Sequence, residues 1–283
     1  MKTYKFLLLS LLTCTLLYTS CSKYGNELSY VETGTLVVKL TDAPFPFDYV
    51  SEANVTIFKI EARLKGSSDS ESEFFTLYEE DMTVNLLELK NGITSTITTV
   101  EVPVGSYDLI RVFVRDGSVI LSNETTYDLK IPSGDQSGIK VFVNPSLEIV
   151  SEISSELLLD FDVSSSFVPK GSTATIDGIT GFNFKPVIRA ANLSFAGSLS
   201  GLVTNVTDGV VTPIEGVQID VLENGSLITT TFTDETGNYT VLGLVAGTYT
   251  IIAEGMEYEI STEEQVEITA ANKTNLDFVL LAK

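Results

Sequence analysis

Two carboxylates separated by one residue are the side chains of this sequence whose type and spacing come closest to catalytic chemistry. Asp160 and Asp162 flank Phe161 within residues 157–163. On a β-strand, residues two apart share a face, so such a pair could act as general acid and base or share a hard cation. Hydrolases that use two acids draw them from elements that face each other across a cleft, so a polar, solvated sheet face is the favoured explanation.

The composition excludes several other chemistries. The 283 residues include no histidine, and the two cysteines, Cys14 and Cys21, both lie in the first 21 residues. A histidine base, a metal site containing histidine, a cysteine nucleophile in the folded body and a disulfide framework are therefore excluded. We expect a protein that is not an enzyme and that carries no cofactor.

A second acidic segment, residues 234–238, has some of the composition of a calcium-binding loop. It lacks the alternating ligands and the distal bidentate glutamate of an EF-hand. A hairpin turn, in which Asp234 accepts hydrogen bonds from its own backbone, explains the same residues better. We therefore predict no dedicated metal site, and weak calcium binding by clustered acids stays as an alternative.

Carbohydrate binding would use aromatic faces stacked on sugar rings, assisted by hydrogen bonds from polar side chains. Tyr127, Tyr239 and Tyr258 are the tyrosines that we expect to be exposed and available for this role. The absence of tryptophan, the best stacking platform, counts against it. These three tyrosines are our candidate ligand contacts.

The charge balance limits the choice of partners. The sequence has 38 Asp and Glu against 17 Lys and Arg, a formal net charge of −21. Such a chain repels phosphate backbones and anionic lipid head groups, so we expect no nucleic-acid partner. With 43% hydrophobic and 19% charged residues, it still has ample material for a folded core.

Residues 1–20 are predicted to form a signal peptide. Lys2 and Lys5 precede a mostly apolar run that ends at Tyr18. This run suits a secretory leader and is shorter than the roughly 20 residues that a membrane-spanning helix needs. The leader is therefore expected to direct export and then to be removed.

Cys21 is the predicted site of lipidation. The small residues Thr19 and Ser20 directly before it resemble the lipobox of bacterial lipoproteins, where the cysteine is diacylated and becomes the new N-terminus. Residues 21–33 would then form a tether between the lipid and the fold. The alternative is an ordinary cleaved signal with two incidental cysteines.

The elements that position these residues are predicted to be β-strands. Beyond the tether, nearly every segment alternates apolar and polar residues and is bounded by Gly, Pro, Asn or Asp. A change of parity within residues 54–64 predicts a β-bulge near Ile57 and Phe58. Residues 79–90 could contain a helical turn, although the apolar run 86–89 is equally typical of a strand, and Asn224-Gly225 predicts a tight hairpin. The expected strands are 34–40, 54–64, 74–78, 106–115, 118–121, 125–131, 139–143, 156–163, 182–189, 199–206, 217–223, 227–233, 238–242, 248–254 and 276–281.

This pattern predicts an all-β protein of two tandem β-sandwich domains. The boundary falls in residues 190–197, so the domains are 34–191 and 198–283. Residues 104–110 and 246–252 are similar, each with a glycine that turns the chain and a tyrosine two places later. A duplication and a common hairpin solution reached twice both account for this echo.

The first domain resembles the bacterial lipoprotein family called domain of unknown function 4382. The resemblance implies a location in the cell envelope and a β fold, and no mechanism. The matching segments are 34–44, 102–107, 131–140, 159–162 and 184–189.

The second domain resembles a carboxypeptidase regulatory-like domain. The resemblance implies a transthyretin-like β-sandwich with a carbohydrate-binding-like fold, of the kind that serves as a rigid spacer or binding accessory. It also gives Tyr239 and Tyr249 a core or strand-entry role, as the resemblance of the first domain does for Tyr107. The matching residues are Gly201 and segments 213–219, 233–239 and 244–249.

These observations favour a lipid-anchored envelope protein of a Gram-negative bacterium that acts as a non-catalytic structural or binding module. We expect it to be anchored in the outer membrane, facing the periplasm or the cell surface, with a glycan or an envelope protein as partner. The alternative is a glycan-binding surface lipoprotein. A glycoside hydrolase that depends on carboxylates is the third hypothesis.

Overall fold

The computed structural model describes residues 32–43, 49–66, 74–131 and 136–283. The predicted signal peptide, Cys21 and most of the tether lie outside the described residues. None of the helices in the described part of the chain is long and apolar enough to cross a membrane.

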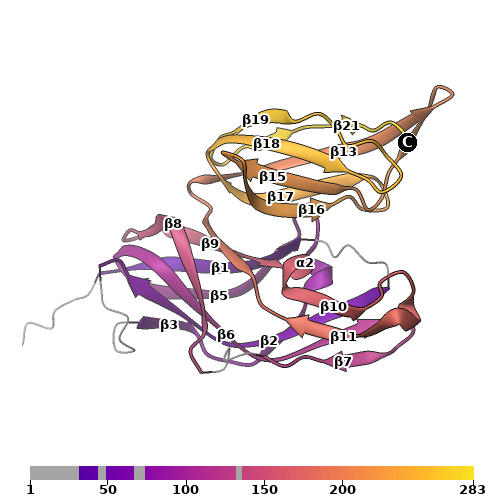
Figure 1. Ribbon diagram of the computed structural model, residues 1–283. Coiled ribbons are helices and arrows are strands. Elements are labelled where there is room, and N and C mark those ends of the chain that lie inside the picture. Colours follow the sequence, from indigo (N-terminus) through magenta and orange to yellow (C-terminus); the bar gives the residue numbers. More distant parts are fainter. Residues whose placement is uncertain (1–31, 44–48, 67–73, 132–135) are drawn as a thin grey trace, which may run out of the picture. The chain divides into compact units, whose positions relative to one another are not determined.

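The first domain is built around a ten-stranded mixed sheet (Figure 1). Its strand order is β3-β2-β6-β8-β12-β9-β1-β5, with β4 paired to β2 and β7 paired to β6. Strands β10 and β11 form a separate two-stranded sheet. The bounds are β1 Thr33–Ala43, β2 Val50–Leu64, β3 Phe74–Tyr78, β4 Met82–Asn85, β5 Ser95–Pro103, β6 Gly105–Leu121, β7 Thr126–Asp128, β8 Ile139–Ile149, β9 Ser154–Asp162, β10 Phe167–Gly171, β11 Ile179–Phe184 and β12 Ile188–Asn192, with short helices η2 Leu86–Leu89, α2 Val163–Ser166 and η3 Ile176–Gly178.

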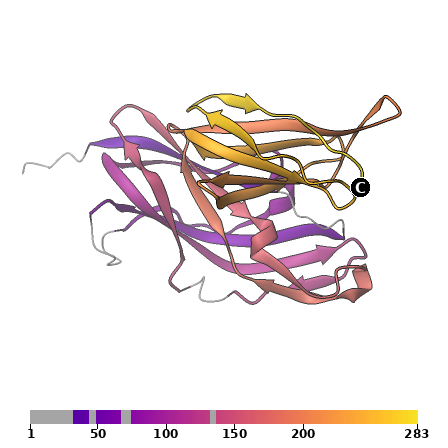
Figure 2. The ribbon, with the colours of Figure 1, turned by 45° about the horizontal axis from the view of Figure 1, so that its top comes forward.

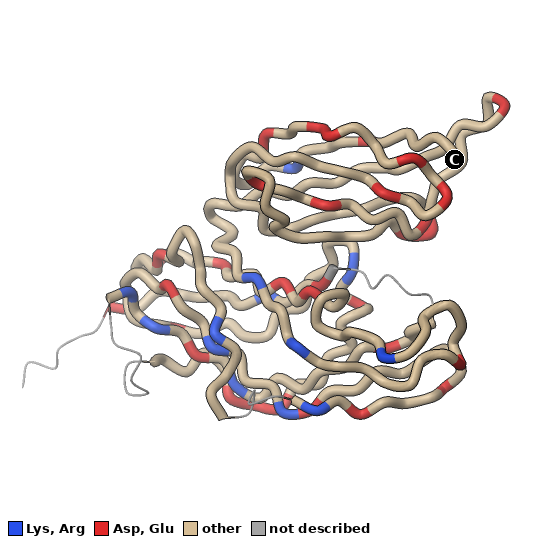
Figure 3. Tube along the Cα trace, viewed as in Figure 1, with Lys and Arg blue, Asp and Glu red and all other residues tan. Residues whose placement is uncertain are grey.

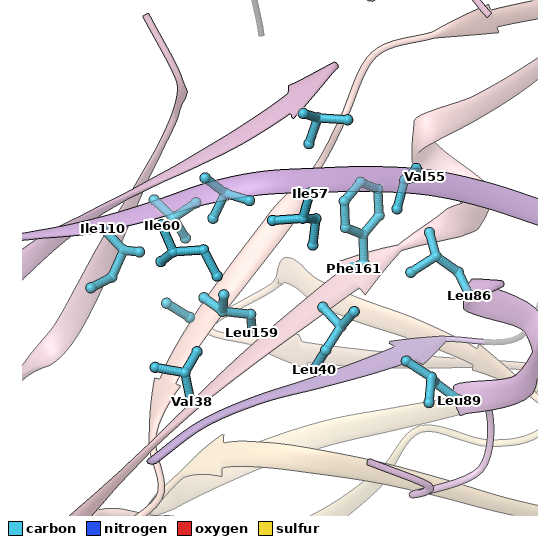
Figure 4. Close-up of a cluster of buried hydrophobic side chains, with 14 of the residues drawn as sticks. Val38, Leu40, Val55, Ile57, Ile60, Leu86, Leu89, Ile110, Leu159 and Phe161 are labelled. Atoms are coloured by element: carbon cyan, nitrogen blue, oxygen red, sulfur yellow. The ribbon is translucent and has the colours of Figure 1, made fainter. Parts of the chain in front are cut away.

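One hydrophobic core lies between the two halves of this sheet. Figure 4 shows Ile57 and Ile60 of β2 opposite Leu40 of β1 and Leu159 and Phe161 of β9. Each of these side chains is almost fully buried, which stabilises the fold by roughly 1.5–3 kcal/mol per side chain. The two layers of the predicted sandwich are therefore two halves of one curled sheet.

The second domain is a β-sandwich of two sheets (Figure 2). One sheet has the order β14-β13-β17, with β20 and β21 also paired to β13, and the other has the order β16-β15-β18-β19. A separate cluster of buried side chains, including Val217, Ile219 and Ile251, forms its core. The bounds are β13 Ala196–Thr207, β14 Val210–Pro213, β15 Gln218–Glu223, β16 Ser226–Phe232, β17 Asn238–Val245, β18 Gly247–Glu254, β19 Glu264–Ile268, β20 Lys273–Asn275 and β21 Phe278–Val279. The all-β prediction is confirmed.

Two local predictions are confirmed in detail. The register between β2 and β6 shifts on both sides of Ile57, which is the predicted bulge. The hairpin between β15 and β16 turns at Asn224 and Gly225, whose φ angles are 50° and 77°. Both positions of this turn need a positive φ, which explains the Asn-Gly pair.

Other predicted elements need correction. Residues 106–121, expected as two strands, form the single strand β6, because Asp116 and Gly117 are also paired with residues of β2. Residues 182–189, expected as one strand, are divided between the end of β11 and the start of β12, and residues 185–187 between them form no strand. Residues 86–89, expected as either a helical turn or a strand, form the 3-10 helix η2, and the strand β4 comes directly before it. Strand β5 was not predicted, because Val102 is its only buried residue and its apolar alternation is weak.

Candidate functional site

Asp160, the first of the two candidate catalytic acids, is bound to an arginine. It stands opposite Arg189 in the register between β9 and β12. Its Oδ2 accepts hydrogen bonds from Nη2 of Arg189 at 2.7 Å and from Nε at 3.2 Å. Asp160 is only 8% exposed, so the expected solvated sheet face is wrong at this position. A buried carboxylate tolerates low polarity when a guanidinium pairs with it in this two-bond geometry.

Asp162, the second acid, begins a helix. Its Oδ1 accepts a hydrogen bond from the backbone N–H of Ser165 at 2.8 Å and another from Oγ of Ser164 at 2.8 Å. It is therefore the N-cap of α2, a role that carboxylates fill because the first N–H groups of a helix lack internal partners. The two acids thus serve separate structural contacts and do not converge on one site.

Tyr239, a candidate ligand contact, lies in the core of the second domain. It is 1% exposed, and its hydroxyl donates to the carbonyl oxygen of Leu276 at 2.6 Å. Burial, together with the negative charge of Asp277, raises the pKa of this hydroxyl well above 10. The expectation that Tyr239 is exposed is wrong, because its ring fills the space between the two sheets and cannot stack on a ligand.

The other two candidate tyrosines are half-buried. The hydroxyl of Tyr127 donates to the carbonyl oxygen of Ile179 at 2.7 Å, and its ring meets Phe182 edge to face at 5.8 Å. Tyr127 thus joins β7 to β11. Tyr258 packs against the core of the second domain and pairs with Ala282 through an isolated β-bridge. Their role as ligand contacts stays a prediction.

The acidic segment 234–238 forms a hydrogen-bonded turn, as predicted. Oδ1 of Asp234 accepts from the backbone N–H groups of Thr236 at 2.9 Å and Asn238 at 3.0 Å, and from the Thr236 hydroxyl at 2.7 Å. Partial burial acts to raise the pKa of Asp234, but these hydrogen bonds outweigh it and lower the pKa below its usual value. Within the described residues, no group of three or more His, Cys, Asp or Glu side chains is placed to hold a metal ion.

A polar groove that the sequence did not reveal lies on the outer face of the first domain. It has a volume of about 500 Å³ and crosses strands β4, β2, β6 and β7. The register places Thr83, Thr56 and Asp116 in one row across three strands. Its lining residues are Asn54, Thr56, Thr83, Asp116, Gly117, Ser118, Asp128 and Leu129.

The second row of the groove consists of Asn54, Ser118 and Asp128, which stand opposite one another on β2, β6 and β7. Gly117 separates the two rows on β6, and a Cβ atom there would lie 3.3 Å from the backbone oxygen of Asn54. The groove is therefore lined by carboxylates, hydroxyls and an amide, together with the apolar side chain of Leu129.

The carboxylates of Asp116 and Asp128 are exposed and make no hydrogen bond or ion pair with any other described residue. In this they differ from Asp160 and Asp162, whose oxygens are taken up by the fold. The Thr56 and Thr83 hydroxyls lie 2.8 Å apart and bond to each other, and each keeps further hydrogen-bonding capacity. Acceptors in the groove are thus available to a ligand.

The predicted bulge in β2 shapes the neighbourhood of this groove. It turns Phe58 as well as Lys59 away from the core, so that Phe58 meets Phe113 at 5.8 Å on the outer side of the sheet. The Arg115 guanidinium lies 4.2 Å from the centre of the Phe58 ring and pairs with Asp81 at 3.1 Å. Phe58 and Arg115 thus form an aromatic and cationic border, two residues from Thr56 on β2 and one residue from Asp116 on β6.

Only some features of the groove could be predicted from the sequence. The alternation in residues 54–56 and 116–118 places the polar side chains on the outer face. Their convergence depends on the pairing of β2 with β6 and of β6 with β7. We predicted a break between residues 115 and 118, which obscured that register.

Comparison with known families assigns both domains. A family model described as a domain of unknown function, DUF4382, matches residues 33–186, more than half of the chain. The chain belongs to this family. A second model, the carboxypeptidase regulatory-like domain, matches residues 198–281 of this DUF4382 protein. Both resemblances drawn from the sequence are confirmed, and neither description names a catalytic activity.

Comparison with solved structures gives distant likenesses of the DUF4382 protein. A DUF3823 family protein from Bacteroides ovatus is 20% identical, with 31% of this chain and 45% of that one covered and a TM-score of 0.25. The minor pilin GBS52 of Streptococcus agalactiae is 11% identical, with coverages of 87% and 96% and a TM-score of 0.30. The shaft pilin SpaA of Lactobacillus rhamnosus GG is 10% identical, with coverages of 89% and 98% and a TM-score of 0.26.

The chain spans under half the length of the DUF3823 family protein, and at these TM-scores we draw no functional argument from any of the three structures. No curated protein matches the sequence.

Proposed function

We propose that this protein is a lipid-anchored cell-envelope protein that acts as a non-catalytic structural or binding module. The proposal rests mainly on the structural roles of Asp160 and Asp162, the two acids whose spacing came closest to that of a catalytic pair. Asp160 is held by Arg189, and Asp162 caps a helix. The pair that could have formed an acid and base centre instead stabilises β9, β12 and α2.

The anchor in this proposal is Cys21, followed by a short tether. The first strand begins at Thr33, twelve residues after Cys21. A tether of that length reaches at most about 40 Å when fully extended, which keeps the fold close to the bilayer. A diacylated cysteine supplies two acyl chains, enough for stable membrane attachment. The high negative charge is consistent with attachment through the lipid alone, since an acidic surface favours solubility beside the membrane over adhesion to anionic lipids.

The distribution of charge supports a module exposed to solvent. Residues 198–283 contain 13 Asp and Glu against two Lys and no Arg. Figure 3 shows that most basic residues lie on the first domain, whereas nearly all charged residues of the second domain are acidic. We infer that the second domain is a soluble spacer. The protein would be anchored in the outer membrane of a Gram-negative cell, with its domains facing the periplasm or the outside.

Mass spectrometry of the mature N-terminus tests the anchor. The full-length chain is expressed in a Gram-negative host, and membrane and soluble fractions are compared with those of the Cys21→Ser variant. We expect the wild-type N-terminal peptide to begin with diacylated Cys21. The Cys21→Ser variant should be found in the soluble fraction instead of the membrane fraction. The Cys14→Ser variant is the matched control and should stay membrane-bound. An unmodified mature N-terminus in the membrane fraction would overturn the anchoring proposal.

A further inference from the structure

We propose that the groove lined by Asp116 and Asp128 is a binding site for a neutral carbohydrate. This rests on the proposed function, because it names the ligand class of a binding module and places it on the first domain. The site differs from the one expected from the sequence, which relied on Tyr127, Tyr239 and Tyr258. The carrying observation is a groove in which two uncommitted carboxylates face amide and hydroxyl groups on neighbouring strands.

The chemistry of the lining matches a polyhydroxylated ligand. Ionised carboxylates only accept hydrogen bonds, whereas the Ser118 and Thr56 hydroxyls can both donate and accept. The Asn54 amide donates one N–H to Glu52 at 2.8 Å and keeps its oxygen and its second N–H. Sugar hydroxyls also donate and accept, so adjacent hydroxyls of one ring can satisfy an Asp and an Asn or Ser together. Hydrogen bonds to a carboxylate are roughly twice as strong as neutral ones, which makes Asp116 and Asp128 the main contacts.

The same lining disfavours other ligands. Phosphates and acidic polysaccharides would be repelled by two carboxylates that form no ion pair with another described residue. A bare Ca²⁺ ion needs six to eight oxygens at 2.3–2.6 Å, and an open groove of about 500 Å³ is too wide to supply them from two carboxylates. A flat apolar ligand would leave both charges desolvated without partners.

The size and border of the groove suit part of an oligosaccharide. Its volume of about 500 Å³ falls within the range of small-molecule sites, and it is open enough for a chain to continue beyond it. Each row crosses three strands, and the two rows together span β4, β2, β6 and β7, so a linear glycan would lie across the strands and reach successive acceptors. Leu129 is the apolar side chain in the lining of the groove, and Phe58 lies next along β2, in contact with Arg115 and Phe113.

The site is built for binding and not for hydrolysis. Glycosidases keep their acid catalyst protonated by placing it in a buried, apolar pocket. Asp116 and Asp128 are both exposed. We therefore expect bound oligosaccharides to stay intact.

Isothermal titration calorimetry of the full mature protein in detergent tests the proposal. The probes are maltoheptaose, cellohexaose, xylohexaose and mannohexaose, with polygalacturonate as the anionic comparison, and each titration is repeated with EDTA. We expect at least one neutral probe to bind, with the Asp116→Ala/Asp128→Ala variant weakening its affinity about tenfold or more. The Asp177→Ala/Glu263→Ala variant removes two exposed acids elsewhere and should bind like the wild type. Melting temperatures of all variants show whether each is folded.

The outcomes separate this proposal from the proposed function. No binding of any neutral probe by folded protein, binding unaffected by the double variant, stronger binding of polygalacturonate, or binding abolished by EDTA would each overturn the carbohydrate site. None of these results bears on the Cys21 anchor, which the mass spectrometry decides. Cleavage of a probe, checked by chromatography, would instead overturn the non-catalytic function.

Discussion

Tyr107 and Tyr249 make the same hydrogen bond in the two domains. Each hydroxyl donates to the carbonyl oxygen four residues before it, that of Pro103 at 2.9 Å and that of Val245 at 2.8 Å. Both rings are buried, and each tyrosine follows a glycine by two residues. A buried tyrosine that bonds back to the preceding turn fixes the direction in which a strand enters its sheet, as in the tyrosine corner of immunoglobulin-like domains. The sequence echo between residues 104–110 and 246–252 therefore encodes one shared structural device.

Removing either hydroxyl is expected to destabilise its own domain. Tyr107→Phe and Tyr249→Phe keep the ring but leave a carbonyl oxygen without its donor, which costs about 1–2 kcal/mol in the free energy of unfolding. Chemical denaturation followed by circular dichroism measures the loss. Tyr258→Phe is the matched control, because its hydroxyl makes no hydrogen bond with another described residue, and it should change stability by less than about 0.5 kcal/mol. Equal losses in all three variants would refute the role of the two paired hydroxyls.

Burial of Tyr107 also predicts a loss of stability at high pH. Burial raises the pKa of its hydroxyl from 10 to about 12. A raised folded pKa means that the folded state holds its proton where the unfolded state has lost it, so the stabilisation is complete below pH 10 and disappears as pH rises towards 12. We expect tyrosinate absorbance and unfolding to rise together in this window. In Tyr107→Phe the slope of stability against pH should be shallower there, and an unchanged slope would contradict the prediction.

The Asp160–Arg189 pair is expected to be structural. Asp160→Ala leaves a largely buried guanidinium without its carboxylate, for which losses of roughly 3 kcal/mol are typical. The double variant Asp160→Leu/Arg189→Leu removes both charges and should recover a large part of that loss, because unpaired charge is the main cost. Denaturation midpoints of the two variants test this. A double variant no more stable than Asp160→Ala would show that the pair contributes more than mutual neutralisation.

The difference between what sequence reasoning found and what it missed has a physical basis. Period-two alternation identifies strands and their buried faces, so the core residues of β1, β2 and β9 could be predicted. The bulge at Ile57 could be predicted as well, since it changes the parity of buried positions. Pairing between distant strands leaves no local signature. For that reason neither the Asp160–Arg189 ion pair nor the convergence of Asp116 with Asp128 was accessible, although each residue lies on a predicted strand or beside one.

The solvent exposure of individual side chains was harder to predict from the sequence than the strands were, and Tyr239 shows why. Its sequence context, after Gly237 and Asn238 at a turn, resembles that of a surface residue. The hydroxyl reaches a backbone carbonyl of Leu276, which follows it by 37 residues, and that distant contact decides its burial. Only the resemblance to the carboxypeptidase regulatory-like domain indicated a core position.

Gly201 gives the sharpest test of the packing in the second domain. A Cβ atom at this position would lie 1.7 Å from the backbone oxygen of Leu276 and 2.8 Å from the ring of Tyr239. Backbone cannot move aside as a flexible side chain can, so Gly201→Ala would force β13 away from the segment that follows β20. We expect a loss of at least about 3 kcal/mol, at the upper end of overpacking effects, or failure to fold.

Gly247→Ala is the matched control for this substitution. An added Cβ there meets nothing closer than 3.7 Å, and the glycine does not adopt a left-handed backbone conformation. The alanine should therefore leave stability within about 0.5–1 kcal/mol of the wild type. Urea denaturation of both variants measures the difference. If Gly201→Ala unfolds at the same urea concentration as Gly247→Ala, then β13 and the chain after β20 are not as close as the packing around Tyr239 requires.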